Sequence, residues 1–559
     1  MKNIKKIFIT TIAVILISSC NLNKLDNPSL LPANQADPNL LLNGVQINFA
    51  DFFVGLSDAG MQVTRLTHLF GPIYNNWFIP SYFNNHWSSA YNGVLVNTKA
   101  VISQAGAKQW YYHTAIAKVI QSYAAMTMVD YFGDVPYSQA LDPTNFNPSA
   151  DKGSDIYAAA LAMLDDAAAD IGKATSSTPA PADLYYGNNW DNWLALINTL
   201  KLKAAVNMGA VSTINSLLSK NLIDAADGSE DFQFQYSTNV SNPDSRNPYF
   251  SGWDGIVASN YVTGAGTFQT NWLMSQMRYG KKNTDGSFAI DPRIRYYFYR
   301  QTGFIDESDP GIVNLLSCVG YQKPARYSKP EWGFCFVKDP QTGSNEGYWG
   351  RDYGDASGVN PDTKVRTNWG VYPIGGKFDD NSFVPNTPND GLKGAGIAPI
   401  MLASYVDFMK AESALRLGTT GSPQTLLISA IDKSINKVMN FGAAAAGASS
   451  YIPSQFQINN YEAAVTALYQ AAVSTGDQLD VIAKEFWIAG FGNGVEIYNM
   501  YRRTNGRPSD MQPALRDPGQ FPNTFPYPLV YTAQNSNAAS KDFSTSVFWY
   551  KSTGTSYIN

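Results

Sequence analysis

Aromatic and amide side chains gather in two loop-like stretches of this sequence, where they could bind a sugar. A flat ring stacks on the C–H face of a sugar with little loss of entropy, and neighbouring amides hydrogen-bond its hydroxyl groups. The first stretch runs from Asn75 to Tyr82 and contains Asn76 and Trp77. Each aromatic contact is worth about 0.5–1.5 kcal/mol beyond its buried area, so micromolar binding needs several of them. We therefore expect Asn76, Trp77 and Tyr82 to contact a ligand.

The second aromatic stretch lies between Trp332 and Trp369, among many glycines. Its candidate ligand-binding residues are Trp349, Arg351, Tyr353 and Trp369. The alternative for any one of these rings is a packing role, in which it fastens an irregular part of the chain to the helices. For the set as a whole, the prediction is that some of the rings are exposed.

The first cysteine, Cys20, closes a stretch that resembles the lipobox of bacterial lipoproteins. Three lysines stand among the first six residues, an apolar run follows from Ile7 to Ile17, and two serines precede Cys20. This pattern is typical of an export signal and is too short for a permanent membrane helix. The resemblance implies that residues 1–19 are removed and that a diacylglycerol on Cys20 anchors the chain, at about 0.8 kcal/mol per buried CH₂. The alternative is an ordinary signal peptide with an incidental cysteine.

The composition favours a neutral ligand. Removing the three lysines of the leader takes the net charge from −5 to −8, which argues against nucleic acid as a partner. Charged residues make up only 15% of the chain and aromatic residues 13%, so the surface must be built from neutral polar and aromatic side chains. Such a surface suits sugars or peptides. We see no other run near 18 apolar residues and expect no further membrane crossing.

The sequence shows no pattern for a metal, a cofactor or a catalytic centre. Only Cys318 and Cys335 remain after Cys20, and an exported chain could join them, although the sequence leaves this open. The three histidines lack metal spacing and are interpreted as packed or surface residues. Neither a GxSxG nor an HExxH motif is present. The sequence also leaves open whether calcium supports a loop, and it predicts no cofactor.

Apolar residues recur at helical spacing on both sides of an irregular middle region. The stretches with this periodicity are 40–69 (one or two helices), 87–102, 116–131, 157–171, 193–204, 401–415, 427–438, 461–473 and 479–501. The alanine-rich pair 157–171 and 193–204 resembles a tetratricopeptide unit in shape. Between 228 and 395, Gly, Pro, Asn and Asp interrupt short aromatic segments, which predicts an irregular insertion with short strands. The glycines from Gly490 to Gly494 follow a helix, so we interpret them as a turn and not as a phosphate loop.

Several motifs resemble those of the SusD/RagB family of outer-membrane lipoproteins from Bacteroidetes. They are MTMVDYFGDVPY (126–137), DPR (291–293), ASYVDFMKAESALRLG (403–418), KEFWIAGFGNGVEIYNMYRRTNG (484–506) and FPYPLVYTAQN (525–535), in the order that the family has them. The motifs span nearly the whole mature chain and accompany the lipobox. One departure is that Asn505 separates Thr504 from Gly506 in the RRT-G element.

The resemblance implies a mostly α, SusD-like fold with tetratricopeptide-like helix pairs and a loop-rich face. It implies a non-catalytic lipoprotein on the outer membrane that binds an oligosaccharide or, in some members, a peptide. We expect the protein to face the exterior, but the residues after Cys20 lack the acidic run that often marks surface export, with Asp26 as the one acid there, so the sequence leaves the final leaflet open. It also implies a partner, a SusC-like TonB-dependent transporter barrel that receives the ligand. The expected organisation is a signal peptide (1–19), a lipidated spacer (20–38) and one domain (39–559), made of a helical frame (39–227 and 396–505), an insertion (228–395) and a C-terminal docking segment (506–559).

Two other functions stay open on sequence alone. A surface glycoside hydrolase would need two placed carboxylates, and no strand–helix alternation predicts a barrel to hold them. An adhesive protein would show no discrete affinity for a small ligand. The charged residues of the motifs favour packing: Glu412 has Arg416 as a partner at i+4, and Arg502 and Arg503 end a helix, where cations are favourable. We therefore expect these residues to hold the fold together.

Overall fold

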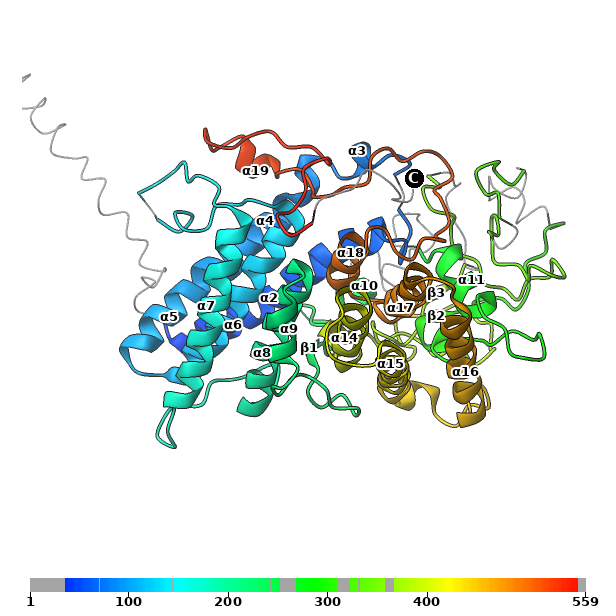
Figure 1. Ribbon diagram of the computed structural model, residues 1–559, viewed down its shortest axis with the longest axis horizontal. Coiled ribbons are helices and arrows are strands. Elements are labelled where there is room, and N and C mark those ends of the chain that lie inside the picture. Colours follow the sequence, from blue (N-terminus) through cyan, green and yellow to red (C-terminus); the bar gives the residue numbers. More distant parts are fainter. Residues whose placement is uncertain are drawn as a thin grey trace, which may run out of the picture.

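The helices of the two halves of the chain form one packed body, with the insertion against its side (Figure 1). The computed structural model describes residues 36–69, 71–142, 144–241, 243–251, 268–309, 322–329, 332–356 and 366–550. Cys20, Cys318 and the export signal therefore lie outside the described residues. The helices of the first half are α2 (Pro38–Val63), α3 (Tyr74–Trp77), the 3₁₀ turn η3 (Pro80–Phe83), α4 (Asn84–Ser88), the π-helical η4 (Ser89–Leu95), α5 (Val96–Ala107), α6 (Tyr111–Phe132), α7 (Gly153–Lys173), α8 (Trp190–Met208) and α9 (Val211–Leu217).

The second half repeats the pattern of long, paired helices. Its helices are α14 (Ala403–Leu417), α15 (Pro423–Ala446), α16 (Gln455–Ala471), α17 (Thr475–Ala489), α18 (Gly494–Arg503) and α19 (Leu529–Thr532). The stretch 479–501 is divided between α17 and α18 because Gly490 ends the first helix and Asn493, whose side chain accepts from the Glu496 N–H, caps the second. The predicted turn at 490–494 is thus confirmed.

The central helix of the molecule is α2. Asp37 caps it by accepting from the Asn39 N–H, and Pro38 occupies its first turn, where no N–H is needed. Among the described residues, α2 is the one helix whose length and composition would suit a membrane span, but 56% of the qualifying stretch is buried. It packs against α5, α6 and α18. We therefore interpret α2 as a core helix.

Short elements make up the insertion, as the sequence predicts. They are β1 (Phe232–Gln235), α10 (Pro248–Ser251), α11 (Asn271–Tyr279), α12 (Ile294–Tyr297), β2 (Phe298–Tyr299) and β3 (Asn368–Trp369), followed by β4 (Ile397–Met401). Two antiparallel pairs connect them: β1 with β4, in the register Gln235↔Ile397, and β2 with β3, in the register Phe298↔Trp369. The fold is mostly helical with few short strands, as expected.

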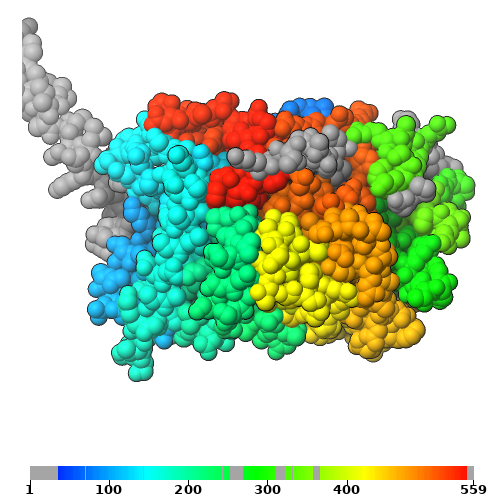
Figure 2. Space-filling view, viewed as in Figure 1, coloured from blue at the N-terminus to red at the C-terminus, as the bar shows by residue number. Residues whose placement is uncertain are grey.

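The chain after α18 runs back over the helices. Figure 2 shows this C-terminal segment along the upper edge of the molecule. Its backbone is tied to both early and middle elements, because the Phe525 N–H donates to the Tyr131 carbonyl (2.8 Å) and the Pro518 carbonyl accepts from the Tyr74 N–H (2.9 Å). The C-terminal segment therefore helps to fix the position of α3, where the first aromatic stretch lies.

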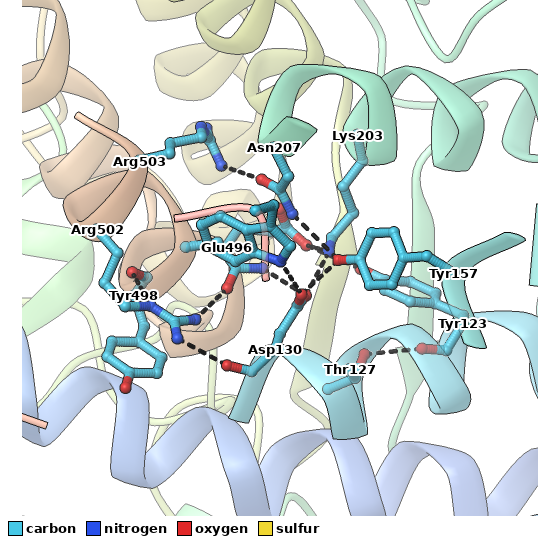
Figure 3. Close-up of polar contacts among 12 residues, drawn as sticks. Tyr123, Thr127, Asp130, Tyr157, Lys203, Asn207, Glu496, Tyr498, Arg502 and Arg503 are labelled. Carbon is cyan, nitrogen blue, oxygen red and sulfur yellow. Dashed lines mark hydrogen bonds and ion pairs between the residues drawn. The ribbon is translucent and has the colours of Figure 1, made fainter. Parts of the chain in front are cut away.

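A fully buried ion cluster joins four long helices (Figure 3). Lys203 of α8 lies 2.9 Å from Asp130 of α6 and 3.6 Å from Glu496 of α18, and all three side chains are inaccessible to solvent. Burial alone would lower the pKa of Lys203, but the two carboxylates outweigh it and raise that pKa. Tyr157 of α7 donates to Asp130, and Tyr123 donates to Glu496 (3.1 Å). Because these side chains are buried and paired with one another, we interpret the cluster as part of the fold.

The two arginines of the motif 484–506 make ion pairs and hydrogen bonds in the same region. Arg503 forms a bidentate pair with Glu412 of α14 (2.8 Å), and Arg416 also contacts Glu412 (3.2 Å). Arg502 donates to the Asp130 and Asn523 carbonyls, both at 2.7 Å. The predicted packing roles of Glu412, Arg502 and Arg503 are confirmed, since each connects segments far apart in the chain.

Helices α2 and α18 cross with almost no space between their backbones, which gives a testable prediction for Gly60. A Cβ added at Gly60 would lie 2.2 Å from the carbonyl oxygen of Gly494, an atom that cannot move aside easily. We expect Gly60→Ala to lower the free energy of unfolding by at least about 1–3 kcal/mol through overpacking. The measurement is urea unfolding followed by circular dichroism.

The matched control is Gly44→Ala on the same helix, where an added Cβ meets nothing within 4 Å. Because alanine has the higher helix propensity, this variant should be as stable as the parent or more stable by about 0.5–1 kcal/mol. Equal stability of the two variants would contradict the close crossing of α2 and α18.

Candidate functional site

The first aromatic stretch lies at the surface, in α3, η3 and the residues between them. The side chain of Asn76 is exposed, whereas Trp77 and Tyr82 are half-buried. The indole N–H of Trp77 donates to Gln62 Oε1 (2.6 Å), and the Tyr82 hydroxyl donates to Asp58 Oδ2 (3.2 Å). Both acceptors belong to α2, so the core helix holds the two rings in fixed orientations. Pre-set rings lose little entropy when a ligand stacks on them.

Three rings form a continuous set, which we call the aromatic row: Trp77, Tyr82 and His86. The ring centres of Trp77 and Tyr82 are 6.5 Å apart, and Tyr82 stacks on His86 with centres 5.6 Å apart and planes 14° apart. His86 Nδ1 lies 3.1 Å from the Tyr82 carbonyl oxygen. Burial lowers the pKa of His86 below 6.5, so the imidazole is neutral at pH 7.

The aromatic row ends at a cavity of about 370 Å³ between α2, α4 and α10, which we call the α2 cavity. This volume is in the range of small-molecule sites. Its lining residues are Asp51, Val54, Gly55, Asp58, His86, Pro248 and Tyr249. Packing explains the glycine at position 55, because a Cβ there would lie 2.6 Å from His86 Cδ2. The backbone of α2 therefore forms one wall of the α2 cavity.

The second aromatic stretch is packed in the interior. Trp349, Arg351, Tyr353 and Trp369 are all buried, so they form no open platform in this structure, contrary to the expectation that some would be exposed. The physical reason is that the insertion has little regular structure, and large rings supply its core. The Arg351 guanidinium lies 4.3 Å from the centre of the Phe268 ring, and Tyr353 lies under the Arg65 guanidinium at 3.7 Å.

One buried residue of the second stretch still supports the candidate site. Trp369 stacks on Tyr249 with ring centres 5.2 Å apart, and Tyr249 lines the α2 cavity. The Trp369 ring also contacts Phe491, with ring centres 4.9 Å apart. Trp369 therefore positions a wall of the cavity without facing it.

Sequence reasoning missed the polar face of α2 and the residue that completes the cavity. Asp51, Asp58 and Gln62 are spaced at i, i+7 and i+11, which places them on one side of α2. That stripe was a readable signal for a site. His86 was interpreted only as a packed or surface residue, and Tyr249 carried no local signal, because its contact with α2 depends on the tertiary fold.

No group of three or more His, Cys, Asp or Glu side chains within the described ranges could hold a metal ion. Cys335 is disulfide-bonded, while Cys318 lies outside those ranges. The chemistry available at the aromatic row and the α2 cavity is stacking, hydrogen bonding and charge attraction. Such a site can bind a ligand.

Family models match both halves of the chain. Residues 33–266 match a family described as "Starch-binding associating with outer membrane", and residues 391–543 match one described as "Susd and RagB outer membrane lipoprotein". No curated protein sequence matches the chain.

Solved structures share the fold at low sequence identity. A SusD/RagB family protein from Bacteroides thetaiotaomicron is 19% identical with a TM-score of 0.63, covering 92% of this chain and 99% of the other. A SusD homologue from Bacteroides fragilis is 18% identical with a TM-score of 0.62 (93% and 100% covered). A chitin-binding SusD homologue from Flavobacterium johnsoniae is 19% identical with a TM-score of 0.56 (91% and 98% covered).

The fold and the family matches define an outer-membrane lipoprotein of the nutrient-binding, non-catalytic class. The chain belongs to the SusD/RagB family. The family associates with the outer membrane and binds carbohydrates. Because the three solved structures named above are less than 20% identical to this chain, their likeness establishes the fold and not the ligand.

Proposed function

We propose that this lipoprotein captures an oligosaccharide at the cell surface, on the aromatic row and in the α2 cavity. The observation that carries the proposal is the row itself: two half-buried rings are held by hydrogen bonds to α2 and lead into a cavity of suitable size. Exposed Asn76 stands beside the rings and can bind hydroxyl groups. The chitin-binding homologue supports a glycan as the ligand class.

The captured ligand would pass to a SusC-like TonB-dependent transporter, which we propose as the partner. A lipid on Cys20, with the following residues as a spacer, would hold the site outside the membrane and close to that barrel. A tethered binding protein raises the local concentration of ligand at the transporter without any chemical step.

The alternatives from the sequence make different predictions. A peptide ligand would use the same rings and cavity. The hypothesis of a surface glycoside hydrolase loses support. A glycosidase places its two carboxylates on either side of the scissile bond, whereas Asp51 and Asp58 come from one face of a single helix. An adhesive protein would show no saturable binding of short oligosaccharides.

Trp77→Ala tests the proposal. We expect the variant to bind its oligosaccharide at least about tenfold more weakly, because one stacking ring and its buried area are lost. The measurement is calorimetric titration of detergent-purified protein against panels of neutral and charged oligosaccharides and of short peptides, using the ligand that binds best.

The control is Trp190→Ala, which removes a half-buried ring that stacks on Tyr112 (3.7 Å between centres) in α6, outside the proposed site. This variant should bind like the parent protein. Binding that is unchanged in Trp77→Ala would contradict the proposed site. A peptide as the best ligand would contradict the proposed ligand class.

A further inference from the structure

The first turns of α2 carry apolar side chains on the surface of the molecule. Leu40 is 71% exposed and Ile47 is 46% exposed, and their spacing of seven residues places them on the same side of α2. Gly44 lies between them on that side, and a Cβ added there would meet nothing within 4 Å. This side of α2 is therefore open to its surroundings.

Other segments extend the surface around the start of α2. Leu184, in the segment before α8, is 40% exposed, and its N–H donates to Gln46 Oε1 on α2 (2.8 Å). At the start of α6, His113 Nε2 lies 2.7 Å from Asn39 Oδ1, and the ring centres of Trp110 and His113 are 5.0 Å apart. These contacts hold both segments beside the first turns of α2.

Three aromatic rings at this place are partly packed and partly open. They are Trp110, Tyr112 and Trp190, and all three are half-buried. Tyr112 of α6 stacks on Trp190 of α8 with ring centres 3.7 Å apart and planes 7° apart. Within the described ranges, their indole N–H and hydroxyl groups donate to no other residue, and these groups are not buried. Rigid rings with an apolar body and a wet polar tip are typical of the boundary between lipid and water.

The charges near these rings are partly paired. Lys118 lies 2.5 Å and Lys173 lies 3.3 Å from the carboxylate of Asp170. The ammonium group of Lys108 lies 4.6 Å from the centre of the Trp110 ring. The stem of such a lysine can cover apolar surface while its charged end stays in water. Contact with a partner would therefore depend on the apolar and aromatic side chains more than on net charge.

The lipid anchor joins the folded body at the same place. We call the exposed or half-buried side chains described above the tether patch: Leu40, Ile47, Trp110, Tyr112, Leu184 and Trp190. The chain is an outer-membrane lipoprotein, and Cys20, the residue expected to carry the lipid, precedes Pro38 at the start of α2 by 18 residues. Even when fully extended, this tether spans at most about 65 Å, so it keeps the start of α2 near the bilayer.

We propose that the tether patch lies in the interfacial region of the outer membrane and fixes the orientation of the folded body beside its lipid anchor. The lipid retains the protein, and the patch sets which side of the body faces the bilayer. A membrane fits this surface because the anchor already holds lipid next to it and because its rings carry open polar tips. The inference does not depend on which ligand the protein binds.

The test is quenching of tryptophan fluorescence by brominated lipids, which act on rings that touch the bilayer. Detergent-purified lipidated protein is added to phosphatidylcholine vesicles with or without bromine on the acyl chains, close to the headgroups. We expect brominated vesicles to quench part of the emission of the parent protein. Trp110→Phe/Trp190→Phe should lose most of this quenching, since it replaces both tryptophans of the patch but keeps an aromatic ring at each position. Added salt should change the quenching little.

Matched variants make the test specific. Trp77→Phe removes a half-buried surface tryptophan of the candidate ligand site and should keep the quenching of the parent protein. Leu40→Ser/Ile47→Ser should reduce the quenching, because the aliphatic part of the patch is lost. Leu468→Ser, which changes a 45% exposed leucine on α16, should not reduce it. Comparable unfolding midpoints confirm that the variants are folded.

Equal quenching of the parent protein and of Trp110→Phe/Trp190→Phe would overturn the contact between the tether patch and the membrane. A photoreactive benzoylphenylalanine in place of Leu40 tests the same contact in intact cells, where it should crosslink to lipid. A crosslink to a membrane protein instead would overturn lipid as the partner of the patch. Oligosaccharide binding should be the same in the patch variants and the parent protein, so this proposal and the proposed capture site can fail separately.

Discussion

Lys203→Met is expected to lower the free energy of unfolding by about 3–5 kcal/mol, because it removes the cation of a fully buried ion cluster. Asp130 and Glu496 lie 2.9 and 3.6 Å from the Lys203 ammonium. Both carboxylates would remain in the interior without that positive charge between them. The loss should be visible as a lower midpoint in urea unfolding at pH 7, followed by circular dichroism.

Lys201→Met on the same helix is the control. Lys201 pairs with Asp165 at the surface, where ion pairs contribute about 0–1 kcal/mol. The double variant Lys203→Met/Glu496→Gln isolates the effect of charge. It removes one uncompensated carboxylate and should therefore be more stable than Lys203→Met alone. If the Lys203→Met protein is as stable as the Lys201→Met protein, Lys203 does not stabilise the buried carboxylates of Asp130 and Glu496 as described.

Cys20→Ala is expected to release the protein from the membrane completely. The lipid that the sequence predicts needs the thiol of Cys20, and α2, the one described helix that would suit a membrane span, is part of the core. Fractionation of cells followed by immunoblotting measures the result, and mass spectrometry of the parent protein detects the acyl chains.

Ser19→Ala keeps a small residue before the cysteine, so this control should stay in the membrane fraction. The released Cys20→Ala protein should bind ligand as the parent does, since the site lies in the folded body. Retention of Cys20→Ala in washed membranes would contradict the lipid anchor.

Much of the fold was predictable because helices repeat their apolar residues locally. The stretch 116–131 corresponds to α6, and 157–171 corresponds to α7. Spacing along one helix also revealed Arg416 as a partner of Glu412 at i+4. It could not reveal Arg503, which reaches the same carboxylate from 91 residues away. Such long-range pairs depend on how helices cross, and periodicity carries no information about that.

The candidate site was predictable in part. Asn76, Trp77 and Tyr82 lie together at the surface, as the first aromatic stretch suggested, although their contact with a ligand stays a prediction. Trp349 and Trp369 look the same in sequence but are buried. Whether a ring among glycines is exposed depends on distant contacts, such as that of Trp369 with Phe491. The sequence alone does not contain that information in readable form.

The most direct measurement is a crystal structure of the protein with the oligosaccharide that binds best. Sugar rings stacked on Trp77 and Tyr82, with one end in the α2 cavity, would agree with the proposed capture site. The molecule offers another place of similar size, a cavity of about 420 Å³ whose lining includes Leu95, Tyr137 and Met163. A glycan bound there, with the aromatic row empty, would contradict the central claim.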